Sequence, residues 1–162
     1  MYLGVISDTH GNILRTHQAM LIFRESGVGR IIHCGDIGPA EILSLFAGTP
    51  LDFVLGNCDW SEADYSDILI PGLVTCHGLF GQIELEGQKI AFMHSHDQLR
   101  FDREATSGRW DMLCYGHTHI SSLWMGCGRT IVLNPGALRR VTTPSVAVVK
   151  LPEREVTHVH LT

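Results

Sequence analysis

Two histidines, His117 and His119, follow a short apolar run in the segment LCYGHTHISSL. Imidazole nitrogens bind divalent transition metals and exchange protons near neutral pH. A single His-x-His pair is more often ordinary structure than a metal site, because such pairs occur by chance. Its interpretation therefore depends on whether other side chains with ligand chemistry gather at the same place in the fold.

Polar side chains of the same kinds follow four other apolar segments. The segments YLGVIS, RIIHC, LDFVLG and KIAFM lead into DTHGN, GD, NCD and HSHD. Each apolar segment is typical of a buried strand, and ligands of open α/β sheets bind at the carboxyl ends of strands. We therefore expect one shared sheet edge for the candidate metal ligands, which are Asp8, His10, Asp36, Asn57, His94, His117 and His119.

The ligand types favour a pair of divalent ions. Carboxylate oxygens and imidazole nitrogens suit Mn, Ni, Fe or Zn, with Mn as our first choice, and the chain offers no thiolate cluster for a structural zinc. The candidate side chains suffice for two four-coordinate ions if one carboxylate bridges them. Two such cations, offset by two carboxylates and a bridging hydroxide, leave a net positive charge that suits an anion. Paired ions ~3.5–4 Å apart promote in-line displacement at phosphorus.

The spacing within the motifs also fits a shared site. In extended backbone the side chains at i and i+2 point to the same face, so Asp8 and His10 are predicted to form a clamp, as are the two histidines of GHTH. Glycines beside the ligands, such as Gly56 and Gly116, allow the chain to turn sharply there.

The hydrophobic pattern predicts the elements that position these side chains. Strands are expected at 1–7, 30–34 and 51–56, and helices at 13–24 and from Pro39 to about Gly48. The second half is mostly strand, with hairpins at 79–94 and 123–136, strands at 111–116, 145–151 and 154–161, and a short helix at 98–105. A βαβαβ half followed by a β-rich half predicts two sheets packed together with helices outside.

Composition limits the class of protein. The 162 residues fit a single domain, and 44% hydrophobic with 18% charged residues exclude a disordered chain. We expect no membrane span, because no apolar run approaches ~20 residues, and no signal peptide, because the run at 2–6 is too short. Five cysteines without a C-x-x-C pair indicate reduced thiols and a cytoplasmic protein. A formal charge of −5 argues against a stable nucleic-acid partner but allows a small anionic substrate.

In their order along the chain, DTHGN, GD, GNCD, a histidine after a strand, and GHTH resemble the motifs of the calcineurin-like metallophosphoesterases. The match is to their small bacterial and archaeal phosphodiesterase branch and runs from Met1 to about Gly136, where NPGALR resembles the family's late turn. The resemblance implies an α/β fold with a four-layer αββα sandwich of two mixed sheets. It implies one ion on Asp8, His10, Asp36 and His119. The second ion would have the ligands Asp36, Asn57, His94 and His117, with Asp36 bridging the two ions.

Two classes of function follow from the motifs. The favoured one is a dinuclear-metal hydrolase that cleaves small phosphodiesters by a metal-bridging hydroxide. The rival is a binding scaffold with a residual metal site, as the small subunit of retromer resembles this family, but intact ligands favour the enzyme. Nuclease action on long DNA fits poorly with the negative charge. The natural substrate and the oligomeric state, including a homo-oligomer, stay open.

The source of the leaving-group proton is also open. Larger relatives carry histidine after the motif asparagine, and here that position is Cys58. Two nearby cations would favour its thiolate, which cannot donate a proton. His96 is predicted either to support the neighbouring ligand or to perform acid–base chemistry. The residues predicted to act in catalysis are Asp36, Asn57, His94 and His96.

Other residues have ordinary structural interpretations. His17 is expected on the apolar face of the helix at 13–24 and His33 inside a strand, so both are assigned to the core. Asn12 is predicted to cap that helix rather than bind phosphate. Trp60 either packs in the core or lines a substrate wall. The arginines at 139 and 140 are either solvated or steer phosphate.

Overall fold

The computed structural model describes all 162 residues and contains two β-sheets. The first sheet has the strand order β11-β10-β1-β2-β3-β4. Its strands are β1 (Tyr2–Ile6), β2 (Val28–His33), β3 (Leu51–Phe53), β4 (Val74–Cys76), β10 (Ser145–Lys150) and β11 (Glu155–His160). Strands β1 to β4 run parallel to one another, whereas β10 and β11 pair antiparallel. The sheet is therefore mixed, with its parallel part at the β1–β4 side.

The second sheet has the order β5-β6-β7-β9-β8. Its strands are β5 (Phe80–Leu85), β6 (Gln88–Met93), β7 (Met112–Tyr115), β8 (Ser122–Met125) and β9 (Ile131–Asn134). The three central strands are parallel, and β5 and β8 close the two edges in antiparallel pairs. The hairpin expected at 79–94 is the pair β5–β6, which turns at Glu86–Gly87.

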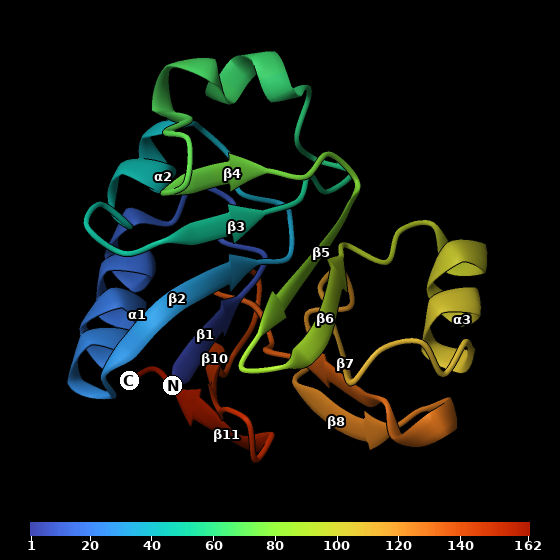
Figure 1. Cartoon of the computed structure of the whole chain (residues 1–162). Helices are drawn as coiled ribbons and strands as arrows, with labels where there is room; N and C mark the ends of the chain where they lie inside the picture. The colour runs from blue at the N-terminus through green and yellow to red at the C-terminus, as the bar shows by residue number, and fades with distance from the viewer.

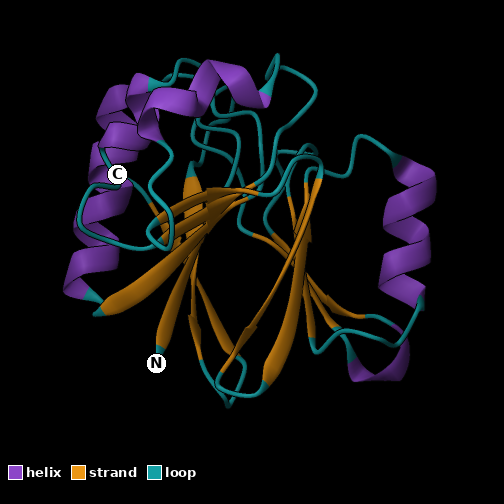
Figure 2. Ribbon diagram, turned by 45° about the horizontal axis from the view of Figure 1, so that its top comes forward, coloured by secondary structure: helices purple, strands orange, loops and turns teal.

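Helices cover the outer faces of both sheets, as Figures 1 and 2 show. The first sheet is covered by α1 (Ile13–Glu25), α2 (Glu41–Ser44) and the 3-10 helix η1 (Glu62–Ile68), and the second by α3 (Gln98–Thr106). A further 3-10 turn, η2 (Cys127–Arg129), joins β8 to β9. No helix is long and apolar enough to cross a membrane. The four-layer αββα sandwich predicted from the sequence is confirmed.

The core lies in three layers of apolar side chains between these elements. Between the sheets, Val5 and Ile32 of the first sheet pack with Phe92 and Cys114 of the second, all with no exposed area. A second cluster fills the space between the first sheet and its helices, and a third lies under α3. Each fully buried side chain of this size contributes about 1.5–3 kcal/mol to folding. The sheets are thereby fixed against each other, and the loops at their ends are held at a set separation.

The helix α1 faces the sheet with different residues from those predicted. Its buried side chains are Thr16, Ala19, Met20 and Phe23, which follow the i, i+3, i+4, i+7 pattern. The prediction of a core position for His17 is wrong, because its side chain is exposed. Thr16 enters the buried face because its hydroxyl donates to the Asn12 carbonyl within the helix, which satisfies the polar group.

The first turn of α1 is exposed although its first two residues are apolar. Ile13 is 62% exposed and Leu14 70%, and Leu21 is exposed as well. The predicted cap is confirmed, since the Asn12 side chain accepts from the Arg15 amide at 3.1 Å.

Two elements between β3 and β5 were not predicted from the sequence. They are η1 and the three-residue strand β4, which pairs with β3. The η1 segment is rich in acidic residues, and β4 is too short to show alternation of apolar and polar residues. The second helix is also shorter than expected, with a regular α-helical part only at Glu41–Ser44.

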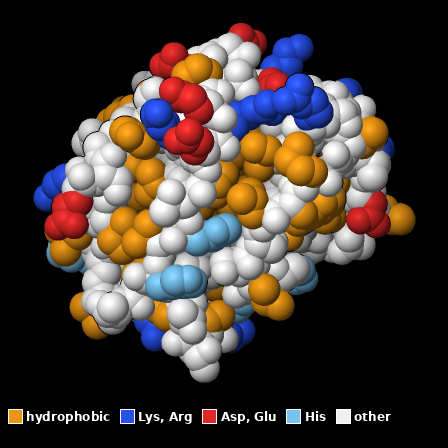
Figure 3. All heavy atoms as spheres, turned by 90° about the horizontal axis from the view of Figure 1, so that it is seen from below, with side chains coloured by type: hydrophobic (Ala, Val, Ile, Leu, Met, Phe, Trp, Pro, Cys, Tyr) orange, Lys and Arg blue, Asp and Glu red, His pale blue; other side chains and the backbone are white.

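The carboxyl ends of the parallel strands in both sheets meet at one end of the sandwich, where the loops gather in Figure 2. The loops after β1 and β2 are joined by backbone hydrogen bonds from Asp8 to Gly35 (3.0 Å) and from His10 to Asp36 (2.9 Å). The face seen from below in Figure 3 shows apolar side chains and histidines near its centre and charged groups mainly towards its margin. The predicted ligands thus emerge from loops that the fold brings side by side.

Candidate metal centre

Two buried aspartates form the centre of the site. Asp8 follows β1 and has no exposed area, and Asp36 follows β2 and is 3% exposed. His119 Nε2 lies 3.0 Å from Asp8 Oδ1, and His94 Nε2 lies 3.2 Å from Asp36 Oδ2. His10 Nε2 is 3.5 Å from the same Asp36 oxygen. The two sheets therefore contribute jointly, with the aspartates on one and the distant histidines on the other.

The ligand atoms fall into overlapping groups of three. One group is Asp8, His10 and His119, and another is Asp8, Asp36 and His94, with all ligand atoms of a group within 4.8 Å of one another. The groups share an aspartate, so they are adjacent rather than separate. Both are composed of oxygen and imidazole nitrogen, the donors that Mn, Fe, Ni and Zn accept.

Two buried atoms in this site have no hydrogen-bond partner: Asp8 Oδ1 and His94 Nε2. They lie 4.0 Å apart. A buried polar atom left unpaired costs about 1–3 kcal/mol, so such atoms in a native fold need an explanation. A cation placed between them would satisfy both, and the donor set fits a divalent ion.

The tautomer of His94 supports the same conclusion. Its Nδ1 donates to the Cys34 carbonyl at 2.8 Å, which leaves the lone pair of a neutral ring on Nε2. That lone pair faces the carboxylate oxygen of Asp36, an arrangement that needs either a proton or a cation in between. Metal-bound histidines commonly use their other nitrogen to bind a backbone carbonyl in this way.

Each aspartate has one oxygen held by the protein and one presented to the site. Ser7 Oγ (2.6 Å) and the His117 amide (3.1 Å) donate to Asp8 Oδ2. The amide of Cys58 donates to Asp36 Oδ1 at 2.8 Å. The remaining oxygens face the histidines, so the protein fixes the orientation of both carboxylates before any ion binds.

The charges in the site shift the pKa values of its groups. Burial alone would lower the pKa of His94, but the close approach and negative charge of Asp36, together with the charge of Asp8, outweigh burial and raise it. Burial would raise the pKa of Asp36, but His94 and the Cys58 amide together lower it. Burial also lowers the pKa of His10, against the opposing charges of the two aspartates. A divalent ion would take the place of the proton that these aspartates hold on His94.

The backbone at the ligands is left-handed rather than extended. Asp8, His10, Asp36, His117 and His119 have φ angles between +41° and +78°. The extended backbone expected for the two clamps is therefore wrong, although His10 Nε2 still lies 3.8 Å from Asp8 Oδ1 as the first clamp predicted. His119 points to Asp8, whereas His117 lies beside His94, with ring centroids 5.2 Å apart. Non-glycine residues in this region store strain of about 1–3 kcal/mol each, which is typical of functional sites.

The other predicted site residues lie at the rim. Asn57 is exposed, and its amide nitrogen donates to Cys58 Sγ at 3.7 Å. His117 and His96 are also exposed, with ring centroids 6.4 Å apart, and the His96 ring lies 5.6 Å from that of His94. The structure thus brings five of the predicted ligands into contact and leaves Asn57 and His117 facing solvent beside them.

The thiol of Cys58 lies next to the His10–Asp36 group. Burial, the hydrogen bond to Asp36 and the charges of Asp36 and Asp59 raise the pKa of this thiol, against the charge of Arg140. The residues of the protein therefore favour the protonated thiol, opposite to the effect expected from two cations.

Asp59 is a structural residue of the site that the sequence interpretation missed. Its carboxylate accepts from the amides of Ile37 (2.9 Å), Gly38 (3.1 Å) and Gly56 (2.8 Å). These bonds tie the loop after β3 to the loop after β2. The signal was present, since Asp59 ends the quoted GNCD motif, but only the asparagine of that motif was assigned chemistry.

The two arginines after the late turn are near the site. Arg139 Nη1 donates to the His10 carbonyl at 2.6 Å, so it supports that loop. The positive charge of Arg140 contributes to the lowered pKa of His10. Arg140 is exposed, which leaves its guanidinium free to attract an anion. The interpretation as solvated residues alone is therefore incomplete.

His33 lies beneath the metal centre and joins its two loops. The Gly35 amide donates to His33 Nδ1 (3.2 Å), His33 Nε2 donates to Thr9 Oγ1 (3.0 Å), and the Thr9 hydroxyl donates to the Ile37 carbonyl (2.9 Å). This chain of bonds requires a neutral ring. The core position predicted for His33 is confirmed, as the residue has no exposed area.

Burial lowers the pKa of His33 from 6.5 to about 3, and the charge of His94 adds to the shift. Between these values the unfolded chain binds a proton that the folded chain excludes, so stability decreases as pH falls. From pH 7 to pH 5 we expect this residue to remove about 2 kcal/mol from the free energy of unfolding. Urea unfolding at both pH values, for wild type and His33→Gln, measures it. Equal losses in the two proteins would contradict the prediction.

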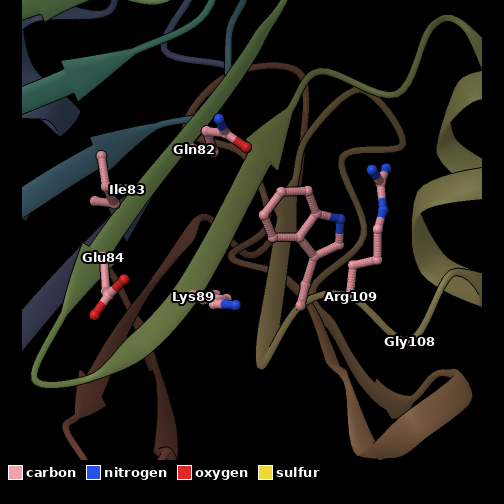
Figure 4. A pocket seen from close by; sticks show the side chains of 7 residues that line it. Gln82, Ile83, Glu84, Lys89, Gly108 and Arg109 are labelled. Atoms are coloured by element: carbon pink, nitrogen blue, oxygen red, sulfur yellow. The ribbon is translucent and has the colours of Figure 1, made fainter.

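A cleft of about 710 Å³ lies away from this centre, on the hairpin β5–β6. Figure 4 shows the side chains of Glu84, Lys89 and Arg109 around it, and Trp110 also lines it. None of the groups with metal-ligand geometry includes a residue of this cleft. The carboxyl edge, rather than this larger hollow, is therefore the candidate active site.

A family model for the calcineurin-like phosphoesterase superfamily domain matches residues 1–154. The chain belongs to the calcineurin-like phosphoesterase superfamily. The phosphodiesterase MJ0936 of Methanocaldococcus jannaschii is 25% identical to this phosphoesterase over 167 residues, covering 96% of each chain. The phosphodiesterase YfcE of Escherichia coli K12 is 30% identical over 156 residues, covering 85% of this chain and 79% of YfcE. The resemblance inferred from the motifs is confirmed.

Solved structures agree on the fold of this phosphoesterase. The structure of an archaeal phosphodiesterase superposes with a TM-score of 0.91 at 24% identity, covering 99% of this chain and 100% of the other. Vps29 of Entamoeba histolytica, crystallised with zinc, gives a TM-score of 0.65 at 19% identity and covers 99% and 98%. At these identities the likeness shows a shared architecture.

Proposed function

We propose that this phosphoesterase holds two divalent ions and hydrolyses small phosphodiesters at the carboxyl edge of its two sheets. The observation that carries the proposal is the pair of buried, unpartnered atoms, Asp8 Oδ1 and His94 Nε2, aimed into one space. The phosphodiesterase names of the relatives MJ0936 and YfcE support the same reaction class.

The proposed ligand sets follow the two adjacent groups of side chains. The first ion is assigned to Asp8, His10, Asp36 and His119. The second is assigned to Asp36, Asn57, His94 and His117. The close contacts of Asp36 Oδ2 with both His10 and His94 support its place between the ions. Asn57 and His117 complete the second set from the exposed side, where substrate approaches. Manganese is our first choice of metal, followed by nickel, iron and zinc.

Divalent ions bound here would acidify a water molecule and withdraw charge from the phosphoryl oxygens. The chain itself orients the site through the fixed oxygens of Asp8 and Asp36 and through the left-handed loops. Arg140 adds positive charge at the mouth, which attracts the phosphate. Proton delivery to the leaving group is proposed for His96 or Cys58. Burial and the charges of His94 and His117 lower the pKa of His96, which makes its protonated ring a stronger acid but a smaller fraction of the population at neutral pH.

Metal stoichiometry tests the proposal most directly. Protein purified without chelator, then stripped and titrated with Mn²⁺, Ni²⁺ or Zn²⁺, is expected to bind two ions per chain. Hydrolysis of bis-p-nitrophenyl phosphate is expected to appear as the ions bind. Elemental analysis and calorimetry report the number of ions independently of activity. A folded sample that binds no more than one ion per chain at saturation would contradict the dinuclear assignment.

We also propose that residues 1–162 act as one phosphoesterase domain in a reducing, cytoplasmic compartment. Both sheets contribute ligands, so neither half is complete alone. All five cysteines are free thiols, which supports a reducing environment. A binding scaffold of the kind named as the rival class does not need two strained, buried carboxylates, so it is the weaker interpretation.

A further inference from the structure

A pocket of about 300 Å³ lies directly beside the metal centre, between the loops that follow β2 and β3. Its walls include Pro39, Cys58, Trp60, Asp64 and Tyr65. Cys58 belongs both to this pocket and to the group it forms with His10 and Asp36. A phosphate held at the metal centre would therefore place one of its substituents at the mouth of the pocket.

Trp60 in this pocket is 95% exposed, so the predicted core position is wrong and the wall position remains. An indole left in water forgoes the burial of 150–250 Å² that is typical of aromatic side chains. The fold therefore gains little from burial of this side chain in the free protein. Its location beside a metal centre, rather than at a remote surface, indicates a contact with a ligand.

The segment that carries Trp60 is anchored on both sides. On one side the Asp59 carboxylate accepts three backbone amides. On the other, the amide and hydroxyl of Ser61 donate to Asp64 Oδ2 at 2.9 and 3.1 Å. Tyr65 Oη lies 2.9 Å from the Gly38 carbonyl and 3.0 Å from Asp59 Oδ1. The indole is therefore presented by a held loop, which reduces the entropy lost when a ligand packs against it.

The charge of the pocket limits what it accepts. Its ionisable carboxylates are Asp59 and Asp64. The oxygens of Asp59 are used by backbone amides, whereas both bonds to Asp64 use Oδ2 and leave Oδ1 free to accept. A second anionic group would be repelled here, and a neutral ring with donors would be accepted. A volume near 300 Å³, the lower end for ligand pockets, suits a single ring system.

We propose that this pocket binds an organic substituent of the phosphodiester, and that the substituent is a flat, uncharged ring stacked on Trp60. The inference rests on the proposed function, because the phosphate must be held at the metal centre for the ring to reach the pocket. The inference adds a substrate class to the proposed function, namely diesters with an aryl or heteroaromatic group. It also assigns Trp60 as a residue that determines specificity.

Binding of two non-hydrolysable probes tests the pocket without relying on turnover. Calorimetry on metal-loaded protein is expected to give phenylphosphonate a Kd at least ~10-fold below that of methylphosphonate. Trp60→Ala should remove this preference and leave the Kd of methylphosphonate unchanged. The matched control is Trp124→Ala, which truncates a tryptophan that is 41% exposed on β8. This variant should keep the preference for phenylphosphonate. A phenyl preference that survives Trp60→Ala, or that is absent in wild type, overturns the proposal.

A second arm tests the charge of the pocket. The probe 4-carboxyphenylphosphonate should bind wild type more weakly than phenylphosphonate does, and Asp64→Asn should reduce the difference. An unchanged difference in Asp64→Asn would remove Asp64 from the proposed site. The control for the proposed function is methylphosphonate itself. If it fails to bind in a metal-dependent way, the phosphate site is misassigned; if it binds and only the phenyl preference is missing, the ring pocket alone is wrong.

Discussion

Replacing Asp36 with asparagine is expected to lower kcat/KM for bis-p-nitrophenyl phosphate by at least ~100-fold, a barrier increase of about 2.7 kcal/mol. Asp36 Oδ2 faces both His10 and His94, so the neutral amide removes the charge at the point where the two ligand sets meet. The amide of Cys58 can still donate to the remaining oxygen, so the loop keeps its anchor. We expect the loss to come with weaker retention of at least one ion, measured by elemental analysis beside the kinetics.

Matched controls separate this effect from a general loss of charge or fold. Asp67→Asn makes the same substitution at an exposed position of η1 and should leave kcat/KM and the melting temperature unchanged. His94→Ala should lose activity as strongly as Asp36→Asn, whereas His17→Ala, at an exposed position, should change neither activity nor stability. If Asp36→Asn retained more than a tenth of the wild-type kcat/KM, the bridging assignment would be wrong.

The parts of the site that could be predicted are those that depend on strand direction. Asp8, Asp36 and His94 each follow a parallel strand, and the carboxyl ends of parallel strands must share an edge. Residue order and apolar runs were therefore enough to predict that these three residues lie close together. The same holds for His10 and His119. Strand direction alone decides which edge these residues share, so their proximity was predictable although the backbone there is left-handed instead of extended.

The parts that could not be predicted depend on loop geometry. Asp59 and Asp36 are both aspartates, so residue type alone does not distinguish their roles. Asp59 accepts hydrogen bonds from backbone amides, whereas Asp36 faces histidines. Trp60 stands just before η1, which apolar periodicity does not reveal because three of its seven residues are acidic and only Tyr65 is buried. For α1, periodicity gave the right element, but the apolar face assigned to His17 is wrong, since the buried side chains are Thr16, Ala19, Met20 and Phe23.

Steric contact, as well as charge, fixes the position of Asp36. Gly56 lies in the loop after β3, and a Cβ added there would overlap both the carboxylate and the backbone nitrogen of Asp36. The glycine is therefore required by close approach, since the carboxylate occupies the space of its missing side chain. Backbone nitrogen cannot rotate away, so a larger residue must displace the whole of Asp36.

Gly56→Ala is accordingly expected to reduce kcat/KM about 100-fold while leaving every proposed ligand chemically intact, because a displacement of about 1 Å at a catalytic group can cost that much. Metal affinity should fall in parallel, which calorimetry with Mn²⁺ measures. Gly29→Ala is the control, because a Cβ there meets only the end of the Met1 side chain at 3.7 Å. Since Gly56→Ala could also lower stability, the comparison is made well below its melting temperature on protein with native circular dichroism. A folded Gly56→Ala protein with wild-type kcat/KM would show that Asp36 tolerates displacement, and the rigid placement argued for it would have to be abandoned.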